Sequence, residues 1–341
     1  MKAACREKSA AYGIYCAEES GSKSTTEGYR YRTKMEIIEQ TTDFRLQKRS
    51  AVALGKFDGV HLGHRELIRR VTEQKQAGLL AVVFTFDTSA AAFFGGEEKE
   101  LTTKAEKRRI FEEMGVDVLI EFPLNRETAA TEPEEFVHRY LAGQMQAAYI
   151  CAGSDLSFGR HGAGNYALLE KYAKQYEYVV ELISKVQIDG EDVSSTRVRE
   201  AVRRGEMELV TRMLGIPYSA AGRVEHGKRL GRTMGMPTAN LLPEADKLLP
   251  PNGVYYSEVI AGGRTYKGIS NVGCKPTVSE EQIMGIETYI YNFGGDLYDR
   301  EISVRLLAFR RPEMRFDSVE SLKAQLEADF AAGRDYKGSS L

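Results

Sequence analysis

Short apolar runs alternate with amphipathic stretches over residues 35–215. The apolar runs have the length of buried strands and lie at 51–54, 79–85, 116–122, 148–152 and 178–183. The stretches between them have helical spacing, and two begin with a capping-box pair, Thr103 with Glu106 and Thr131 with Glu134. This alternation predicts a doubly wound parallel sheet, the architecture of Rossmann-like α/β domains.

After residue 216 the pattern changes to strands without intervening helices. Segments at 253–260, 264–271, 286–293 and 301–310 alternate with glycine-rich turns, which predicts an antiparallel β-barrel. A terminal helix at 318–331 is indicated by the capping-box spacing of Asp317 and Glu320. Its apolar stripe, expected to pack against the barrel, consists of Val319, Leu322, Leu326 and Phe330. We therefore expect an extension at 1–34, domains at 35–215 and 216–335, and a tail at 336–341.

The first 34 residues lack this folded pattern. A weakly apolar stretch at 10–17 follows Lys2, Arg6 and Lys8, but it is too interrupted for a secretory leader. The polar sequence at 18–34 predicts disorder. Met35 opens the folded pattern and is a candidate translation start.

The charge balance excludes some classes of partner. With 47 basic and 49 acidic residues the formal net charge is −2, so no global field attracts nucleic acid or an anionic membrane. The longest apolar runs fall well short of the roughly 18 residues that indicate a membrane span. The four cysteines have no paired short spacing, which favours reduced thiols in the cytoplasm.

A glycine- and histidine-rich turn follows the apolar run 51–54. It contains Gly55, Asp58, His61, Gly63 and His64 and precedes a helical pattern at 65–73. Backbone N–H groups at a helix start attract phosphate, imidazoles can bond its oxygens, and glycine lets the backbone approach. The spacing is typical of nucleotidylyl transfer. The alternative is a pair of ordinary histidines at a helix start.

Two other segments of the first half are ambiguous by themselves. Ser195, Thr196 and Arg199 begin a helical pattern, where hydroxyls and a guanidinium can clamp phosphate but also serve as ordinary caps. Asp155 lies in a tight loop after the apolar run 148–152, where it could line a ligand site or simply turn the chain.

The second half has its own candidate chemistry. Thr238 and Asn240 follow Pro237 in a run that shows no comparable strand and helix context, and their oxygens suit magnesium. Glu287 lies inside a strand-like run, where an acid pointing inward is unexpected unless it is paired or catalytic. An exposed strand glutamate is the alternative interpretation.

These motifs, in this order, resemble the bacterial bifunctional riboflavin kinase/FAD synthetase family from about residue 35 to residue 329. The resemblance implies that the first half is an FMN adenylyltransferase of the nucleotidylyltransferase superfamily. It implies ATP binding by residues of the histidine turn and the two later segments. These are Gly55, Phe57, Asp58, His61, Gly63, His64, Asp155, Ser195, Thr196 and Arg199.

In the second half the resemblance is to riboflavin kinase. It implies an ATP loop comprising Gly227, Gly231, Arg232, Gly235 and Pro237. It also implies that Thr238 and Asn240 bind Mg²⁺, that Glu287 is the catalytic base, and that Arg311 and Phe316 contact the flavin.

The expected function is therefore phosphorylation of riboflavin to FMN and adenylylation of FMN to FAD, with ATP as co-substrate of both reactions. The chain has Phe86-Asp87-Thr88-Ser89-Ala90 where many relatives carry Phe-Asp-Pro-His-Pro, so it lacks the histidine and the prolines of that loop. It also has Leu156 for a common phenylalanine and Tyr289 for a common histidine. A riboflavin kinase with a degenerate adenylyltransferase half and a noncatalytic flavin-binding regulator stay open as alternatives, and the oligomeric state is undetermined.

Overall fold

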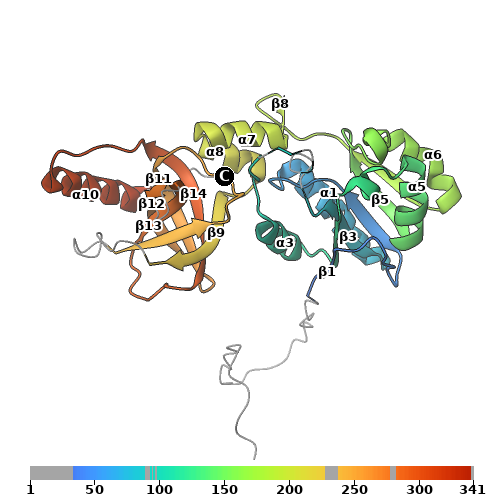
Figure 1. Ribbon diagram of the computed structural model, residues 1–341, viewed down its shortest axis with the longest axis horizontal. Coiled ribbons are helices and arrows are strands. Elements are labelled where there is room, and N and C mark those ends of the chain that lie inside the picture. The colour runs from blue at the N-terminus through green and yellow to red at the C-terminus, as the bar shows by residue number, and fades with distance from the viewer. Residues whose placement is uncertain are drawn as a thin grey trace, which may run out of the picture. The chain divides into compact units, whose positions relative to one another are not determined.

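Six parallel strands form the sheet of the N-terminal half (Figure 1). The structure is a computed structural model that describes residues 34–88, 93, 95–96, 98–226, 237–276 and 282–338. The sheet has the order β1-β4-β3-β2-β5-β6, which confirms the doubly wound prediction. Its strands are β1 (Glu36–Glu39), β2 (Ser50–Leu54), β3 (Leu80–Phe86), β4 (Val118–Phe122), β5 (Ala147–Gly153) and β6 (Val179–Ile183).

Both faces of the central strands of this sheet are buried. Along β2, Ala51 and Ala53 belong to one buried cluster with α1 (Leu62–Glu73) and α3 (Lys104–Glu113). Val52 and Leu54 belong to another cluster with η2 (Phe136–Gln144) and α6 (Tyr166–Tyr176). Successive side chains of a strand point to opposite faces, so the continuous apolar run of β2 reports a strand covered on both sides. The shorter elements of this half are η1 (Gln74–Ala77), α4 (Arg126–Ala129), α5 (Pro133–Glu135), η3 (Arg160–Gly162), β7 (Gln187–Ile188), β8 (Glu191–Asp192), α7 (Ser195–Arg204) and α8 (Met207–Leu214).

One of the two predicted caps in this half is confirmed. The Thr103 hydroxyl accepts from the Glu106 N–H, and the Glu106 carboxylate accepts from the Thr103 N–H. The Thr131 cap is wrong, because α5 begins at Pro133 and Glu132 is its N-cap. Proline is preorganised for the first helical position, so it sets the start of this helix.

The C-terminal half is a closed barrel of antiparallel strands in the order β10-β13-β12-β11-β14-β9, as predicted (Figure 1). Strands β9 and β10 were not anticipated, and the expectation that the Thr238 run lacks strand context is wrong. In β10, Ala239 and Leu241 are buried while Thr238 and Asn240 are only partly so, an alternation too short to recognise in sequence. The strands are β9 (Tyr218–Glu225), β10 (Thr238–Pro243), β11 (Gly253–Ala261), β12 (Arg264–Pro276), β13 (Gln282–Ile290) and β14 (Glu301–Arg311).

The terminal helix is α10 (Val319–Asp335). Its N-cap is Ser318, which forms a capping box with Ser321, so the predicted pair of Asp317 and Glu320 is wrong by one residue. Val319 is 66% exposed and does not pack, whereas Leu322, Leu326 and Phe330 line a cavity against the barrel. The apolar stripe is therefore correct from its second member onward.

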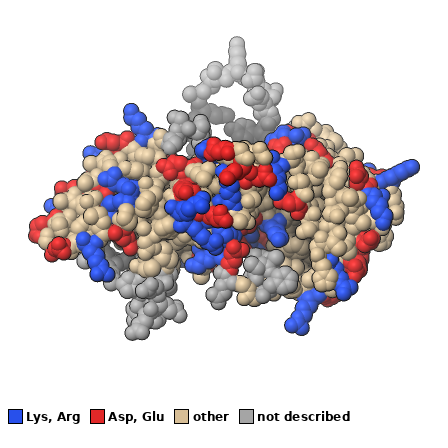
Figure 2. All heavy atoms as spheres, turned by 90° about the horizontal axis from the view of Figure 1, so that it is seen from above, with Lys and Arg blue, Asp and Glu red and all other residues tan. Residues whose placement is uncertain are grey.

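The two halves share buried surface. Val198 and Val202 of α7 and Met213 of α8 belong to the same buried cluster as Tyr218 and Val304 of the barrel. The expected domain boundary near residue 215 thus stays a prediction. On the face in Figure 2 acidic and basic side chains are interleaved, as the balanced composition indicates. Within the described part of the chain no helix has the length and apolar character needed to cross a membrane.

Candidate active sites

The first candidate site lies where the strand order of the parallel sheet reverses. Strand β2 pairs with β3 on one side and with β5 on the other, and the chain continues outward in both directions. Loops at the carboxyl ends of two such strands leave a crevice for ligands. The loop after β2 carries the histidine turn, and the loop after β5 carries Asp155.

His61 and His64 stack on each other at the start of α1. His61 is the N-cap of this helix, and the ring centroids lie 3.8 Å apart with an interplanar angle of 18°. The Nδ1 atoms of both rings are buried and have no hydrogen-bond partner among the described residues. A Cβ added at Gly63 would lie 3.3 Å from the His61 ring, so glycine allows this close packing.

Burial keeps both imidazoles neutral. Desolvation lowers the pKa of His61 to about 4, against an opposing effect of the Asp155 carboxylate. Burial and the neighbouring His61 hold the pKa of His64 well below its usual value. An anionic ligand would offer hydrogen-bond partners to these two buried nitrogens, and its negative charge would favour protonation of a ring.

The backbone of this turn is strained in a way that sets its shape. Phe57 and Val60 have φ angles of 52° and 42°, and Gly59 has 81°. Non-glycine residues rarely adopt this left-handed region, and where they do the cost is often associated with a functional site. The Phe57 side chain is fully buried and packs edge-on against Phe111, so any ligand contact of Phe57 would involve its backbone.

Asp58 and the start of α7 come together around a cavity of about 300 Å³. Arg199 forms an ion pair of 2.5 Å with Asp58, and the Ser195 hydroxyl donates to the Asp58 carbonyl at 2.8 Å. Thr196 also lines this cavity, whereas Ser194 is the helix cap. Two of the three segments predicted to act together thus meet here, the histidine turn through Asp58 and the start of α7. Asp155 of the third segment is 72% exposed and pairs with Lys185. Six charged residues that line this cavity were not predicted, although Lys56 adjoins the glycine of the motif. They are Lys56, Glu98, Glu100, Lys107, Glu200 and Arg203.

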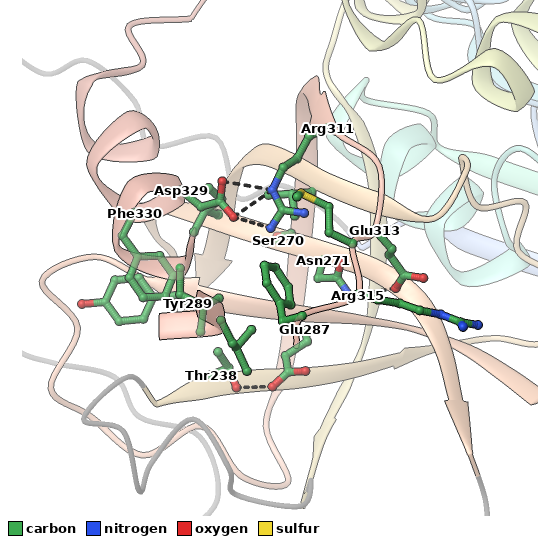
Figure 3. Close-up of a pocket in the computed structure, with 16 residues that line it drawn as sticks. Thr238, Ser270, Asn271, Glu287, Tyr289, Arg311, Glu313, Arg315, Asp329 and Phe330 are labelled. Atoms are coloured by element: carbon green, nitrogen blue, oxygen red, sulfur yellow. Dashed lines mark hydrogen bonds and ion pairs between the residues drawn. The ribbon is translucent and has the colours of Figure 1, made fainter. Parts of the chain in front are cut away.

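The second candidate site is a cavity of about 620 Å³ between the barrel and α10 (Figure 3). Glu287, Thr238, Arg311 and Phe316 all line it, so four predicted residues are brought together. The carboxylate of Glu287 accepts a hydrogen bond of 2.5 Å from the Thr238 hydroxyl. Asn240 is the cross-strand neighbour of Glu287.

Glu287 does not point into the barrel core. Its neighbours Ile286 and Thr288 are buried, and Ile286 belongs to the core cluster of the barrel. Because side chains alternate along a strand, Glu287 and Tyr289 lie on the opposite face, toward α10 (Figure 3). A carboxylate on this face stays accessible to a substrate.

Arg311 is already paired in this structure. Its guanidinium binds the carboxylate of Asp329 at 2.5 and 3.1 Å, and Arg310 binds the same carboxylate at 2.8 Å. Burial alone would raise the pKa of Asp329, but these hydrogen bonds lower it. Tyr289 stacks on Phe330 of α10, with centroids 4.3 Å apart. The Asp329 contact was missed, because Asp329 belongs to no motif, whereas the packing of Phe330 against the barrel was predicted from the apolar stripe of its helix.

A further cavity of about 830 Å³ lies on the other side of Thr238. It is lined by Pro237, Thr238 and Asn240, together with residues 292–298 from the segment that follows β13. Thr238 and Tyr289 line both cavities, so they stand between them. The predicted ATP residues Gly227, Gly231, Arg232 and Gly235 lie outside the described residues.

Family models match the two halves of the chain separately, and known proteins match both halves together. A family model of FAD synthetase matches residues 43–197, and a model of riboflavin kinase matches residues 214–337. A bifunctional riboflavin kinase/FMN adenylyltransferase of Listeria monocytogenes is 35% identical over 85% of this chain and 93% of its own length. The chain belongs to this bifunctional family.

Other relatives of the riboflavin kinase/FMN adenylyltransferase family extend over the same region. The protein of that name from Pseudomonas fluorescens is 33% identical over 88% of this chain and 97% of its own length. A crystal structure from Streptococcus pneumoniae, described as a macrolide-efflux protein, has a TM-score of 0.80 at 30% identity. It covers 89% of this chain and all of that one. The predicted family and both predicted folds are thus confirmed.

Proposed function

We propose that this protein makes FMN from riboflavin in its barrel half and FAD from FMN in its parallel-sheet half, using ATP in both reactions. The observation that carries this proposal is that each half gathers its own motif residues around its own cavity. Glu287, Thr238, Arg311 and Phe316 meet in one half, and Asp58 meets the start of α7 in the other. Each site has a chemistry that the other lacks.

In the kinase reaction, the 5′-hydroxyl oxygen of the ribityl chain attacks the γ-phosphorus of ATP. Glu287 accepts the hydroxyl proton, the bond from the γ-phosphorus to its bridging oxygen breaks, and ADP leaves. The hydrogen bond from Thr238 orients the Glu287 carboxylate before substrate arrives. Phe316 and Tyr289 supply aromatic walls for an isoalloxazine ring. Pro237 and the cavity beyond Thr238 suit the nucleotide.

The residues around Glu287 fit Mg²⁺. The hydroxyl of Thr238 and the amide oxygen of Asn240, both beside Glu287, are the hard oxygen donors that this ion prefers. Thr238 and Asn240 would hold the ion at the boundary of the two cavities. When bound there, it supplies positive charge to the phosphates of ATP.

In the adenylyltransferase reaction, a phosphate oxygen of FMN attacks the α-phosphorus of ATP. The bond to the α–β bridging oxygen breaks, pyrophosphate leaves, and no covalent enzyme intermediate is needed. Positioning and charge stabilisation supply most of the rate acceleration. His61 and His64 have buried nitrogens available for phosphate oxygens, and Thr196 and Arg199 offer further donors at the start of α7, where the Ser195 hydroxyl donates to the Asp58 carbonyl.

A kinase with an inactive adenylyltransferase half is the second candidate. Thr88, the first residue of the departing Thr88-Ser89-Ala90 segment, lines the cavity beside Asp58 and Arg199. Ser89 and Ala90 lie outside the described residues. An altered loop at this place would act on the adenylyltransferase reaction alone. We place both reactions in the cytoplasm, a proposal supported by the free thiols of Cys151 and Cys274.

The test is to incubate the purified protein with ATP, Mg²⁺ and either riboflavin or FMN, and to separate the flavins by chromatography. We expect riboflavin to yield FMN and then FAD, and FMN to yield FAD. FMN as the final product would favour the second candidate. No conversion of either flavin, oxidised or reduced, would favour a noncatalytic flavin-binding regulator instead.

A further inference from the structure

A buried ion pair joins the kinase half to the adenylyltransferase half. Lys247, between β10 and β11, lies 2.6 Å from the carboxylate of Glu106 in α3, and these side chains are 1% and 4% exposed. The Lys247 ammonium also donates to the Leu101 carbonyl at 2.7 Å and lies over the Tyr218 ring. A buried charge is tolerated only with such compensation, so this geometry is closely defined.

Glu106 is equally well satisfied. Besides Lys247, its carboxylate accepts from the Thr103 N–H in its own capping box and from the Ala221 N–H of β9, both at 3.0 Å. One side chain therefore fixes the start of α3, a barrel strand and the loop that carries Lys247.

The backbones at this contact are also bonded to each other. The Glu100 N–H donates to the Asp246 carbonyl at 2.7 Å, and the Leu248 N–H donates to the Glu100 carbonyl at 2.8 Å. Residues 100 and 247 form an isolated parallel bridge. Residues 100–102 are thus held against the barrel by main chain as well as by charge.

Residues 99–102 also form hydrogen bonds to the loop after β2 and to Arg199 of α7. The Leu101 N–H donates to the Asp58 carboxylate at 2.9 Å, and the Gly59 N–H donates to the Thr102 hydroxyl at 3.1 Å. The Lys99 carbonyl accepts from Arg199, which is paired with Asp58. Leu101 therefore bonds Lys247 through its carbonyl and Asp58 through its N–H.

We propose that Lys247, a residue of the kinase half, is a positioning residue for adenylyl transfer. Through Leu101 and Glu106, Lys247 holds residues 99–102 in place. These residues in turn position Asp58, Gly59 and Arg199. The barrel then contributes a positioning residue to the adenylyltransferase site in addition to carrying the kinase site. This inference rests on the proposed function, because it assigns a second role within it. A displacement of about 1 Å at a reacting group can cost a hundredfold in rate, so a distant anchor can matter.

The test uses the full-length double variant Lys247→Met with Glu106→Gln. Methionine keeps most of the lysine stem and glutamine keeps the shape of glutamate, so no lone charge is left buried. The single amide oxygen of glutamine can accept from only one of the Thr103 and Ala221 N–H groups, which bond different oxygens of Glu106. We expect kcat for FAD formation from FMN to fall at least tenfold. The kcat and KM of FMN formation from riboflavin should stay within twofold of wild type.

A matched control removes another buried acid–base contact of the barrel half. Arg310→Met takes one of the two arginines from Asp329, far along the chain from residues 100–102. It should lower the unfolding temperature without lowering kcat for FAD formation. The comparison separates loss of stability from loss of position.

Each other outcome has a distinct meaning. Wild-type rates of FAD formation in the double variant would overturn the role of Lys247. A parallel fall of both activities together with the unfolding temperature would reduce the pair to a structural contact and would overturn it equally. If the wild-type protein made no FAD from FMN, the proposed adenylyltransferase function itself would be wrong, and this role of Lys247 with it.

Discussion

The two candidate sites use strands in opposite ways. In the parallel-sheet half the site residues lie on loops and helix starts beyond the strand ends, and among the described residues the buried Nδ1 atoms of His61 and His64 have no partner. In the barrel the site residues lie on the strands themselves and are already paired, Glu287 with Thr238 and Arg311 with Asp329. The histidines of the first site therefore have nitrogens open to an anion, although Arg199 and Asp58 there are paired with each other. In the second site Glu287 and Arg311 would exchange existing partners for substrate.

This difference has an electrostatic consequence. Desolvation disfavours charge on the two histidines, so their protonation depends on the ligand. In the barrel site Glu287 accepts a hydrogen bond from Thr238, and Asp329 accepts one from Arg311, in the absence of substrate. We expect substitutions in the two sites to differ in which reaction they affect, in pH dependence and in metal dependence.

The largest expected effect is at Glu287. Glu287→Gln keeps the shape and can still accept the Thr238 hydrogen bond, but it cannot take the proton of the ribityl hydroxyl. We expect FMN formation to fall by about a thousandfold, since a general base contributes about 10² to 10⁴. FAD formation from supplied FMN should be unchanged. Both rates can be measured by flavin chromatography on one preparation.

His64→Ala should give the reverse result. Loss of one phosphate donor in a buried site costs about a hundredfold or more in rate, so FAD formation from FMN should fall by about that factor. FMN formation from riboflavin should persist. If either substitution, at Glu287 or at His64, reduced both reactions equally, the two-site model would be wrong.

The third prediction concerns pH and stability. An ordinary histidine in the unfolded chain takes up a proton near pH 6.5, whereas burial lowers the pKa of His61 to about 4. Between these values the unfolded state binds more protons, so the free energy of unfolding falls as the pH falls. For His61 this amounts to about 2 kcal/mol between pH 7 and pH 5.

His61→Gln should remove that part of the slope. The measurement is denaturant unfolding at several pH values, compared with wild type. The control is His161→Asn at an exposed histidine of the same half, where asparagine tolerates the positive φ of 56°. An unchanged slope in His61→Gln would mean that His61 is not buried as the structure has it.

Much of the fold could be predicted, because strands covered on both faces leave continuous apolar runs, as 51–54 does for β2. Strand β1 was missed because glutamates at 36 and 39 leave it only two apolar residues at a sheet edge. The caps at Thr131 and Asp317 failed because several residues compatible with a cap stand side by side, and the local backbone decides among them.

The candidate sites divide in the same way. The loop residues of the first site are contiguous in sequence, so Asp58, His61 and His64 could be named together. The barrel site depends on register, which sets Asn240 opposite Glu287 and which no local pattern contains. The Lys247–Glu106 pair connects residues 141 apart in sequence, and the capping box that names Glu106 gives no sign of Lys247.

The smallest expected effect is at Thr238, and it tests whether the Thr238 hydroxyl binds the metal or only orients Glu287. Thr238→Val keeps the shape and removes the hydroxyl, whereas Thr238→Ser keeps the hydroxyl as a control. If Thr238 is a ligand, the Mg²⁺ concentration for half-maximal FMN formation should rise about tenfold in the valine variant, the equivalent of about 1.4 kcal/mol. If its hydroxyl only orients Glu287, kcat should fall at every Mg²⁺ concentration and the half-maximal concentration should stay the same. In both variants FAD formation from FMN should respond to Mg²⁺ as in wild type, because Thr238 lies in the barrel site and not in the site of the parallel sheet.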